Sequence, residues 1–123
     1  MERYDGYIIS WRERLKKEKI QQQEKIAAAK KLAEECAQLL VERYGAKRVY
    51  LIGSLAREGV FHEMSDIDLV VEGLPSHCYI AALTEVWNRL PKGFHVDLIP
   101  IEDAFDGIRQ RVKREGVLLH EGK

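Results

Sequence analysis

Apolar residues recur along this chain with two different periods, and these periods predict its helices and strands. Between residues 26 and 40, apolar side chains return every three or four positions, which is the spacing of one helix face. Ser10 and Glu13 have the spacing of a capping box, so we expect a long helix to begin at Ser10 and end at Gly45. Its first half is rich in Lys, Glu and Gln, so residues 1–25 are expected to project from the core.

Two interpretations of this projecting half remain open. Lysines and glutamates three or four positions apart stabilise a helix that is simply surrounded by water. Alternatively, Trp11, Leu15 and Ile20 make the segment an arm that docks on a partner protein. The high charge of the segment favours the solvated helix, because charged helix faces usually face solvent.

Apolar runs and helical segments alternate in the rest of the chain. Strands are expected over residues 47–52, 66–72 and 94–99, and helices over 77–90 and 104–115. Ser76 is the expected N-cap of the first of these helices. Residues 117–120 form either a further strand or an extended tail. This order predicts one domain over residues 1–123, an α/β fold in which helices pack a mixed β-sheet behind a long N-terminal helix.

Carboxylates interrupt two of the expected strands. Asp66 and Asp68 are two positions apart, so on a strand they face the same side. Neighbouring acids repel each other and are costly to desolvate, and a divalent cation between them relieves both costs. Mg²⁺ is held in this way, by one or two carboxylates and the phosphates of a substrate. Asp97 lies in another apolar run and can complete the cluster if the two strands pair.

A glycine and a serine follow the strand expected over residues 47–52. Gly53 lets other groups approach the backbone closely, and Ser54 offers a hydroxyl and an N–H group at a helix start, where phosphates bind. Ser54 is also compatible with an ordinary helix cap. Arg57 either neutralises phosphate charge or pairs with a nearby glutamate, and Ser65 can bond to the backbone. We group Gly53, Ser54, Arg57 and Ser65 as predicted nucleotide-phosphate-binding residues.

Three motifs together resemble the nucleotidyltransferase superfamily that includes the palm of DNA polymerase β. They are Gly53-Ser54, Asp66-Ile67-Asp68 and Asp97. Within that superfamily, the short chain is similar to the minimal nucleotidyltransferases of prokaryotes. One departure is visible, because Glu58 follows Arg57 where family members commonly have glycine, and the loop is one residue longer. This departure affects the expected role of Arg57 more than it affects the metal ligands.

The resemblance implies a reaction and its cofactors. Asp66 and Asp68 would bind two Mg²⁺ ions, and Asp97 would bind the catalytic ion. ATP or another nucleoside triphosphate would be the substrate, and AMP would pass to a hydroxyl of a partner protein. Minimal family members often act as antitoxins that modify a tyrosine of a helical HEPN-type toxin, so such a toxin is the expected partner.

Composition limits the remaining possibilities. Lys plus Arg and Asp plus Glu both number 20 in 123 residues, so the chain has no net basic field that would attract nucleic acid. No apolar stretch suits a membrane span, and two distant cysteines suggest the cytoplasm. We keep two alternative functions, a non-catalytic module that binds metal or nucleotide and neutralises its partner by contact, and transfer to a small-molecule hydroxyl. A homo-oligomer is also compatible with the sequence.

Overall fold

A four-stranded mixed sheet forms the centre of the protein. The computed structural model describes residues 2–53 and 67–122, with side chains described from residue 10 onward except at residue 22. The strands are β1 (Arg48–Ile52), β2 (Ile67–Glu72), β3 (Val96–Pro100) and β4 (Val117–Glu121). β1 pairs antiparallel with β2 and β4, and β2 pairs parallel with β3, which gives the order β3-β2-β1-β4. The predicted α/β fold with a mixed sheet is confirmed, and the segment after Gly116 is a strand rather than a tail.

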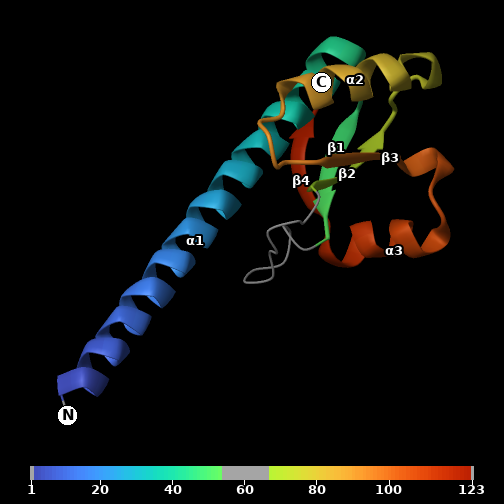
Figure 1. Cartoon of the computed structure of the whole chain (residues 1–123). Helices are drawn as coiled ribbons and strands as arrows, with labels where there is room; N and C mark the ends of the chain where they lie inside the picture. The colour runs from blue at the N-terminus through green and yellow to red at the C-terminus, as the bar shows by residue number, and fades with distance from the viewer. Residues whose placement is uncertain (1, 54–66, 123) are drawn as a thin grey trace.

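Helices cover both faces of this sheet (Figure 1). They are α1 (Glu2–Tyr44), α2 (Tyr79–Arg89) and α3 (Asp106–Glu115), with short 3-10 turns η1 (Ser76–Cys78) and η2 (Ile101–Asp103). α1 and α2 pack on one face and enclose the larger apolar core. α3 packs on the other face, where Val112 meets Ile52 and Val70 in a smaller cluster. Within the described residues, no helix combines the length and hydropathy needed to cross a membrane.

Residue size and strand alternation explain how these layers meet. Ala33, Ala37 and Leu40 on α1 are fully buried, and the two small residues allow the helix backbone to approach the sheet closely. β2 is central, so successive residues of this strand enter different cores. Leu69 joins the core under α1, and Val70 joins the cluster under α3. β2 is therefore fixed from both sides.

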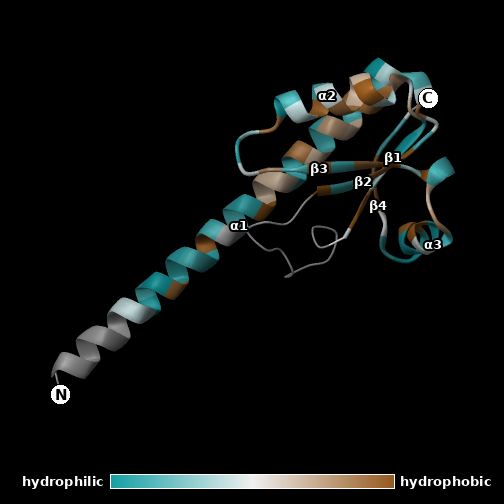
Figure 2. Cartoon of the chain, turned by 45° about the vertical axis from the view of Figure 1, so that its right-hand side comes forward, coloured by the Kyte–Doolittle hydropathy of each residue, from teal (hydrophilic) through white to brown (hydrophobic). Residues whose placement is uncertain are grey.

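The first half of α1 extends away from the sheet. The described side chains from residue 10 to residue 24 are exposed, including Trp11, which is 68% exposed, and Leu15. Figure 2 shows hydrophilic residues over most of this part of α1 and apolar residues where the helix reaches the sheet. The exposure of residues 10–24 agrees with the predicted projection, and docking of a partner on it stays a hypothesis.

Both serine caps predicted from the sequence are wrong. α1 begins at Glu2, so Ser10 lies inside the helix and not at its start. Gly6 is the only strong helix breaker before it, and one glycine costs a helix about 1 kcal/mol, too little to end it. Ser76 lies in η1, and neither η1 nor α2 begins with a side-chain cap hydrogen bond.

Candidate functional site

Two of the predicted ligands lie side by side on neighbouring strands. Asp68 on β2 and Asp97 on β3 are register partners in the parallel pair. Ile67 and Leu69, on either side of Asp68, enter the core under α1, so Asp68 faces the opposite side, toward the α3 layer. Adjacent strands are about 4.8 Å apart, and residues in register on them share a face. Asp68 is half-buried and Asp97 is exposed, so solvent reaches this pair of acids.

Gly53 lies against Asp68 where β1 ends. Ile52 is the register partner of Asp68, and Gly53 is the next residue of the chain. Gly53 has a φ of 85°, in the left-handed region that favours glycine. A Cβ added to Gly53 would lie 2.5 Å from Oδ2 of Asp68, so that carboxylate occupies the space of the absent side chain. Glycine is needed here for its backbone conformation and also for the approach of Asp68.

These three residues lie at one end of the sheet, beside the cluster under α3. Val70, two positions after Asp68 on the same face, packs with Ile52 and Val112 in that cluster. Ile99, two positions after Asp97, packs against the same cluster. The face is therefore apolar under α3 and acidic where β2 and β3 begin. We call Gly53, Asp68 and Asp97 the site end of the sheet.

The other predicted site residues lie outside the described part of the chain. They are Ser54, Arg57, Ser65 and Asp66, together with Glu58 of the longer loop. Their predicted roles stay predictions. Within residues 2–53 and 67–122, no group of three or more His, Cys, Asp or Glu side chains could hold a metal. Two of the three predicted ligands lie in these ranges.

The donor set of the site end fits a hard divalent cation. Carboxylate oxygens are the ligands that Mg²⁺ prefers, and Mg²⁺ is usually held by one or two of them together with substrate phosphates. Two carboxylates in register repel each other, and a cation between them removes that repulsion. Asp68 and Asp97 are the described residues that would hold such an ion. Because Gly53 has no side chain, the carboxylate of Asp68 can lie against the backbone at the end of β1.

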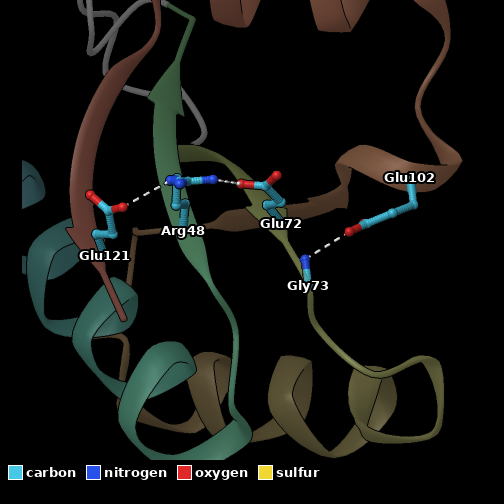
Figure 3. A network of polar contacts seen from close by, with 5 residues as sticks. All are labelled: Arg48, Glu72, Gly73, Glu102 and Glu121. Atoms are coloured by element: carbon cyan, nitrogen blue, oxygen red, sulfur yellow. Dashed lines mark hydrogen bonds and ion pairs between the residues drawn. The ribbon is translucent and has the colours of Figure 1, made fainter. Parts of the chain in front are cut away.

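The opposite end of the same face has a different arrangement, which Figure 3 shows. Arg48 lies between two acids, and its Nη1 donates to Glu72 at 2.8 Å and its Nε to Glu121 at 3.1 Å. The hydrogen bond to Glu72, followed by the one to Glu121, raises the pKa of the Arg48 guanidinium above its usual value. The N–H of Gly73 donates to Glu102 at 2.7 Å. We call Arg48, Glu72, Gly73 and Glu121 the arginine end of the sheet.

One residue near the site end differs from its sequence interpretation. The helical spacing of Trp87 with Val86 and Leu90 predicts a core side chain. Val86 is fully buried, but Trp87 is 55% exposed, and its Nε1 donates to the carbonyl of Val96 at 3.0 Å. Tyr79 makes a related bond to Leu98 at 2.7 Å. Spacing along a helix cannot reveal these bonds, because they depend on which strand lies beside the helix.

A family model and several solved structures are similar to this chain. The model described as "Polymerase beta, Nucleotidyltransferase" matches residues 34–123. A toxin–antitoxin crystal structure with AMP-PNP is 25% identical, with a TM-score of 0.59 and coverage of 73% of each chain. The MntA–HepT toxin–antitoxin structure is 22% identical, with a TM-score of 0.54 and coverage of 75% of this chain and 71% of the other.

A third structure adds a chemical detail about a relative. It is a tri-AMPylated HEPN toxin of Shewanella oneidensis in complex with an MNT antitoxin. The match is 22% identical, has a TM-score of 0.55 and covers 76% of this chain and 73% of the other. No curated protein sequence matches this chain. At these identities, the MntA–HepT and Shewanella matches show a common fold.

Proposed function

This chain belongs to the polymerase beta nucleotidyltransferase family, and we propose that it transfers AMP from ATP to a hydroxyl group of a partner protein in the presence of Mg²⁺. The observation that carries the proposal is the site end of the sheet. Asp68 and Asp97 are in register on one face, and Gly53 lies against Asp68. Carboxylates in this arrangement suit an ion that also contacts a triphosphate.

The chemistry of the transfer accounts for the residue types. The hydroxyl oxygen of the acceptor forms a bond to the α-phosphorus, the bond from that phosphorus to the bridging oxygen breaks, and pyrophosphate leaves. The hydroxyl proton passes to solvent. Bound Mg²⁺ would neutralise charge on the attacking and leaving oxygens. Asp97 is the more exposed of the two described acids, so we place the acceptor on its side and the triphosphate beside Gly53.

We further propose that the partner is a HEPN-type toxin, which makes this chain an antitoxin. Similar solved structures are toxin–antitoxin complexes, and one contains an AMPylated HEPN toxin. The sequence has no net charge, which favours a protein acceptor over nucleic acid.

Labelling of a partner tests this proposal. The chain is co-expressed with a candidate HEPN-type toxin, and transfer of label from α-labelled ATP is followed with and without Mg²⁺. We expect label on the partner with the parent chain and with Glu72→Gln, which alters an acid at the arginine end. The double variant Asp66→Asn with Asp68→Asn should give none. Equal labelling by this double variant would refute the proposal.

The exposed half of α1 supports a second candidate, neutralisation by contact alone. Trp11 and Leu15 are large apolar side chains on a helix segment surrounded by solvent, so a partner could cover them. The two candidates differ in what happens when the acids are removed. If cells carrying the toxin survive equally well with the aspartate double variant, contact is sufficient. If survival is lost, AMP transfer is required.

A further inference from the structure

β3 forms one edge of the sheet, and its outward-facing backbone groups can be identified from its pairing with β2. The N–H of Ile67 donates to the carbonyl of His95 at 2.8 Å. In a parallel pair, backbone groups of alternate residues face the neighbouring strand, so positions 95, 97 and 99 face β2. Val96, Leu98 and Pro100 therefore direct their backbone groups toward the free edge.

Helix α2 provides hydrogen-bond donors to this edge. Nε1 of Trp87 donates to the carbonyl of Val96 at 3.0 Å. The hydroxyl of Tyr79 donates to the carbonyl of Leu98 at 2.7 Å. Pro100, the next outward-facing residue, has no N–H to satisfy. Val96 and Leu98, the neighbours of Asp97 along the chain, are therefore each hydrogen-bonded to an aromatic side chain of α2.

The contact of Trp87 with β3 is a specific hydrogen bond and not only apolar packing. Trp87 is 55% exposed, so much of its ring remains in water, and the indole N–H is the group that connects it to β3. Edge strands lose their pairing more readily than central strands, because nothing holds their outer side. β3 is an edge strand by position, but it is hydrogen-bonded on both sides, to β2 and to α2.

On the basis of the proposed function, we propose that Tyr79 and Trp87 are positioning residues for Asp97. Their hydrogen bonds keep β3 in register with β2, which holds the Asp97 carboxylate beside that of Asp68. Loss of these bonds weakens binding of the ion that Asp97 holds. At saturating Mg²⁺ it leaves nucleotide binding unchanged, because the triphosphate is expected beside Gly53 on β1, across β2 from β3.

Phenylalanine substitutions test the proposal. Tyr79→Phe removes one hydroxyl, and Trp87→Phe removes the indole N–H while keeping an aromatic ring. Tyr44→Phe is the matched control, since it also removes a phenol hydroxyl, one that donates to the carbonyl of Ala81 on α2 at 3.5 Å rather than to a carbonyl of β3. For each variant, three quantities are measured: hydrogen exchange of the Ile67 amide, Mn²⁺ affinity in the presence of AMP-PNP, and the Mg²⁺ and ATP dependence of AMP transfer.

Each variant at the β3 edge should change the ion-dependent quantities. We expect exchange of the Ile67 amide to be about fivefold faster and Mn²⁺ affinity about fivefold weaker, the effect of losing one neutral hydrogen bond. The Mg²⁺ concentration for half-maximal transfer should rise by the same factor, while the KM for ATP stays within about twofold. Tyr44→Phe should match the parent chain in all of these measurements.

Other outcomes separate this proposal from the proposed function. Unchanged exchange and unchanged Mn²⁺ affinity in both edge variants would overturn the positioning role, and so would equal changes in the Mg²⁺ requirement and the KM for ATP. A parent chain that binds Mn²⁺ but transfers no AMP would overturn the proposed function alone, with the positioning role then decided by exchange and affinity. A parent chain that binds no Mn²⁺ would overturn both.

Discussion

The two ends of the α3 face of the sheet use charge in opposite ways. At the arginine end, Arg48 lies between Glu72 and Glu121 and supplies the cation that these acids require. At the site end, Asp68 and Asp97 lie side by side, acid next to acid. An acid beside an arginine contributes to the fold, whereas two acids in register are costly for it. Under the proposed function, a bound cation would do at the site end what Arg48 does at the arginine end.

Each end of the sheet also contains a glycine, and the two glycines have different neighbours. Gly53 and Gly73 both have φ in the left-handed region, 85° and 77°, and both leave room for a neighbouring side chain. A Cβ at Gly73 would lie 2.8 Å from Cγ of Lys47, in the apolar part of that side chain nearest the backbone. A Cβ at Gly53 would instead meet the Asp68 carboxylate. Both ends therefore have a glycine with positive φ, and they differ in the side chain that lies against it.

The largest expected difference between the two ends comes from replacing one acid of each end by its amide. Asp97→Asn should lower the rate of AMP transfer about a thousandfold, because a metal ligand supports several kcal/mol of charge stabilisation in the transition state. Glu72→Gln should leave the rate within about twofold. Initial rates with ATP and Mg²⁺ measure both. Comparable losses in the two variants would show that the ends do not differ in function.

Alanine at each glycine should give the next largest effect. Gly53→Ala and Gly73→Ala should each lower the free energy of unfolding by about 1 to 3 kcal/mol, because both positions have positive φ. Only Gly53→Ala should also slow AMP transfer, by about tenfold or more, since it displaces Asp68. Urea denaturation and initial rates separate the two consequences. A similar loss of rate in Gly73→Ala would point to general destabilisation.

A bound metal ion should stabilise the chain through the acids of the site end and not through the arginine end. With AMP-PNP present throughout and Mn²⁺ at ten times its dissociation constant, the ion should add about 1.4 kcal/mol of stability to the parent chain, and a chelator should reverse the gain. The double variant Asp68→Asn with Asp97→Asn should gain nothing, whereas Arg48→Met should gain as much as the parent. Thermal unfolding with and without the ion provides the measurement. A gain that survives in the double variant would place the ion elsewhere.

The smallest effect is expected at the arginine end. Arg48→Met should cost less stability than either glycine substitution, because both of its ion pairs are partly exposed, and salt should reduce the cost. The pKa of Arg48 is raised, so its contribution is complete below the ordinary arginine pKa and is lost only above it. The arginine should therefore stay charged, and contribute, throughout the neutral pH range. Urea denaturation at two salt concentrations tests this expectation.

The alternation of inward and outward side chains along a strand made the positions of Asp68 and Asp97 largely predictable from the sequence. The apolar runs around Asp68 and Asp97 identify two buried strands, and the two-residue period predicts that Asp68 faces away from the residues on either side of it. The parallel pairing of β2 with β3 then brings the two acids together. Whether they bind a metal stays a prediction, as does the role of the loop that carries Ser54 and Asp66.

Features that depend on a distant partner were not predictable. The sequence of residues 117–120 suits a strand or a tail equally well, and only its pairing with β1 decides for a strand. Helical spacing predicts a buried Trp87, but it does not specify the β3 carbonyl that the indole reaches across the edge of the sheet. The capping box at Ser10 failed for another reason, because no residue between Glu2 and Ser10 is costly enough to end the helix before the motif.

Because half of α1 projects from the sheet, the two tryptophans of the chain can report on separate regions. The sequence contains 2 tryptophans, Trp11 on the projecting segment and Trp87 beside β3, and both are more than half exposed. The fluorescence of Trp87 in a Trp11→Phe chain reports on the sheet edge, and that of Trp11 in a Trp87→Phe chain reports on the segment that extends into solvent. Emission and anisotropy can thus follow the segment and the sheet edge independently, without an added label.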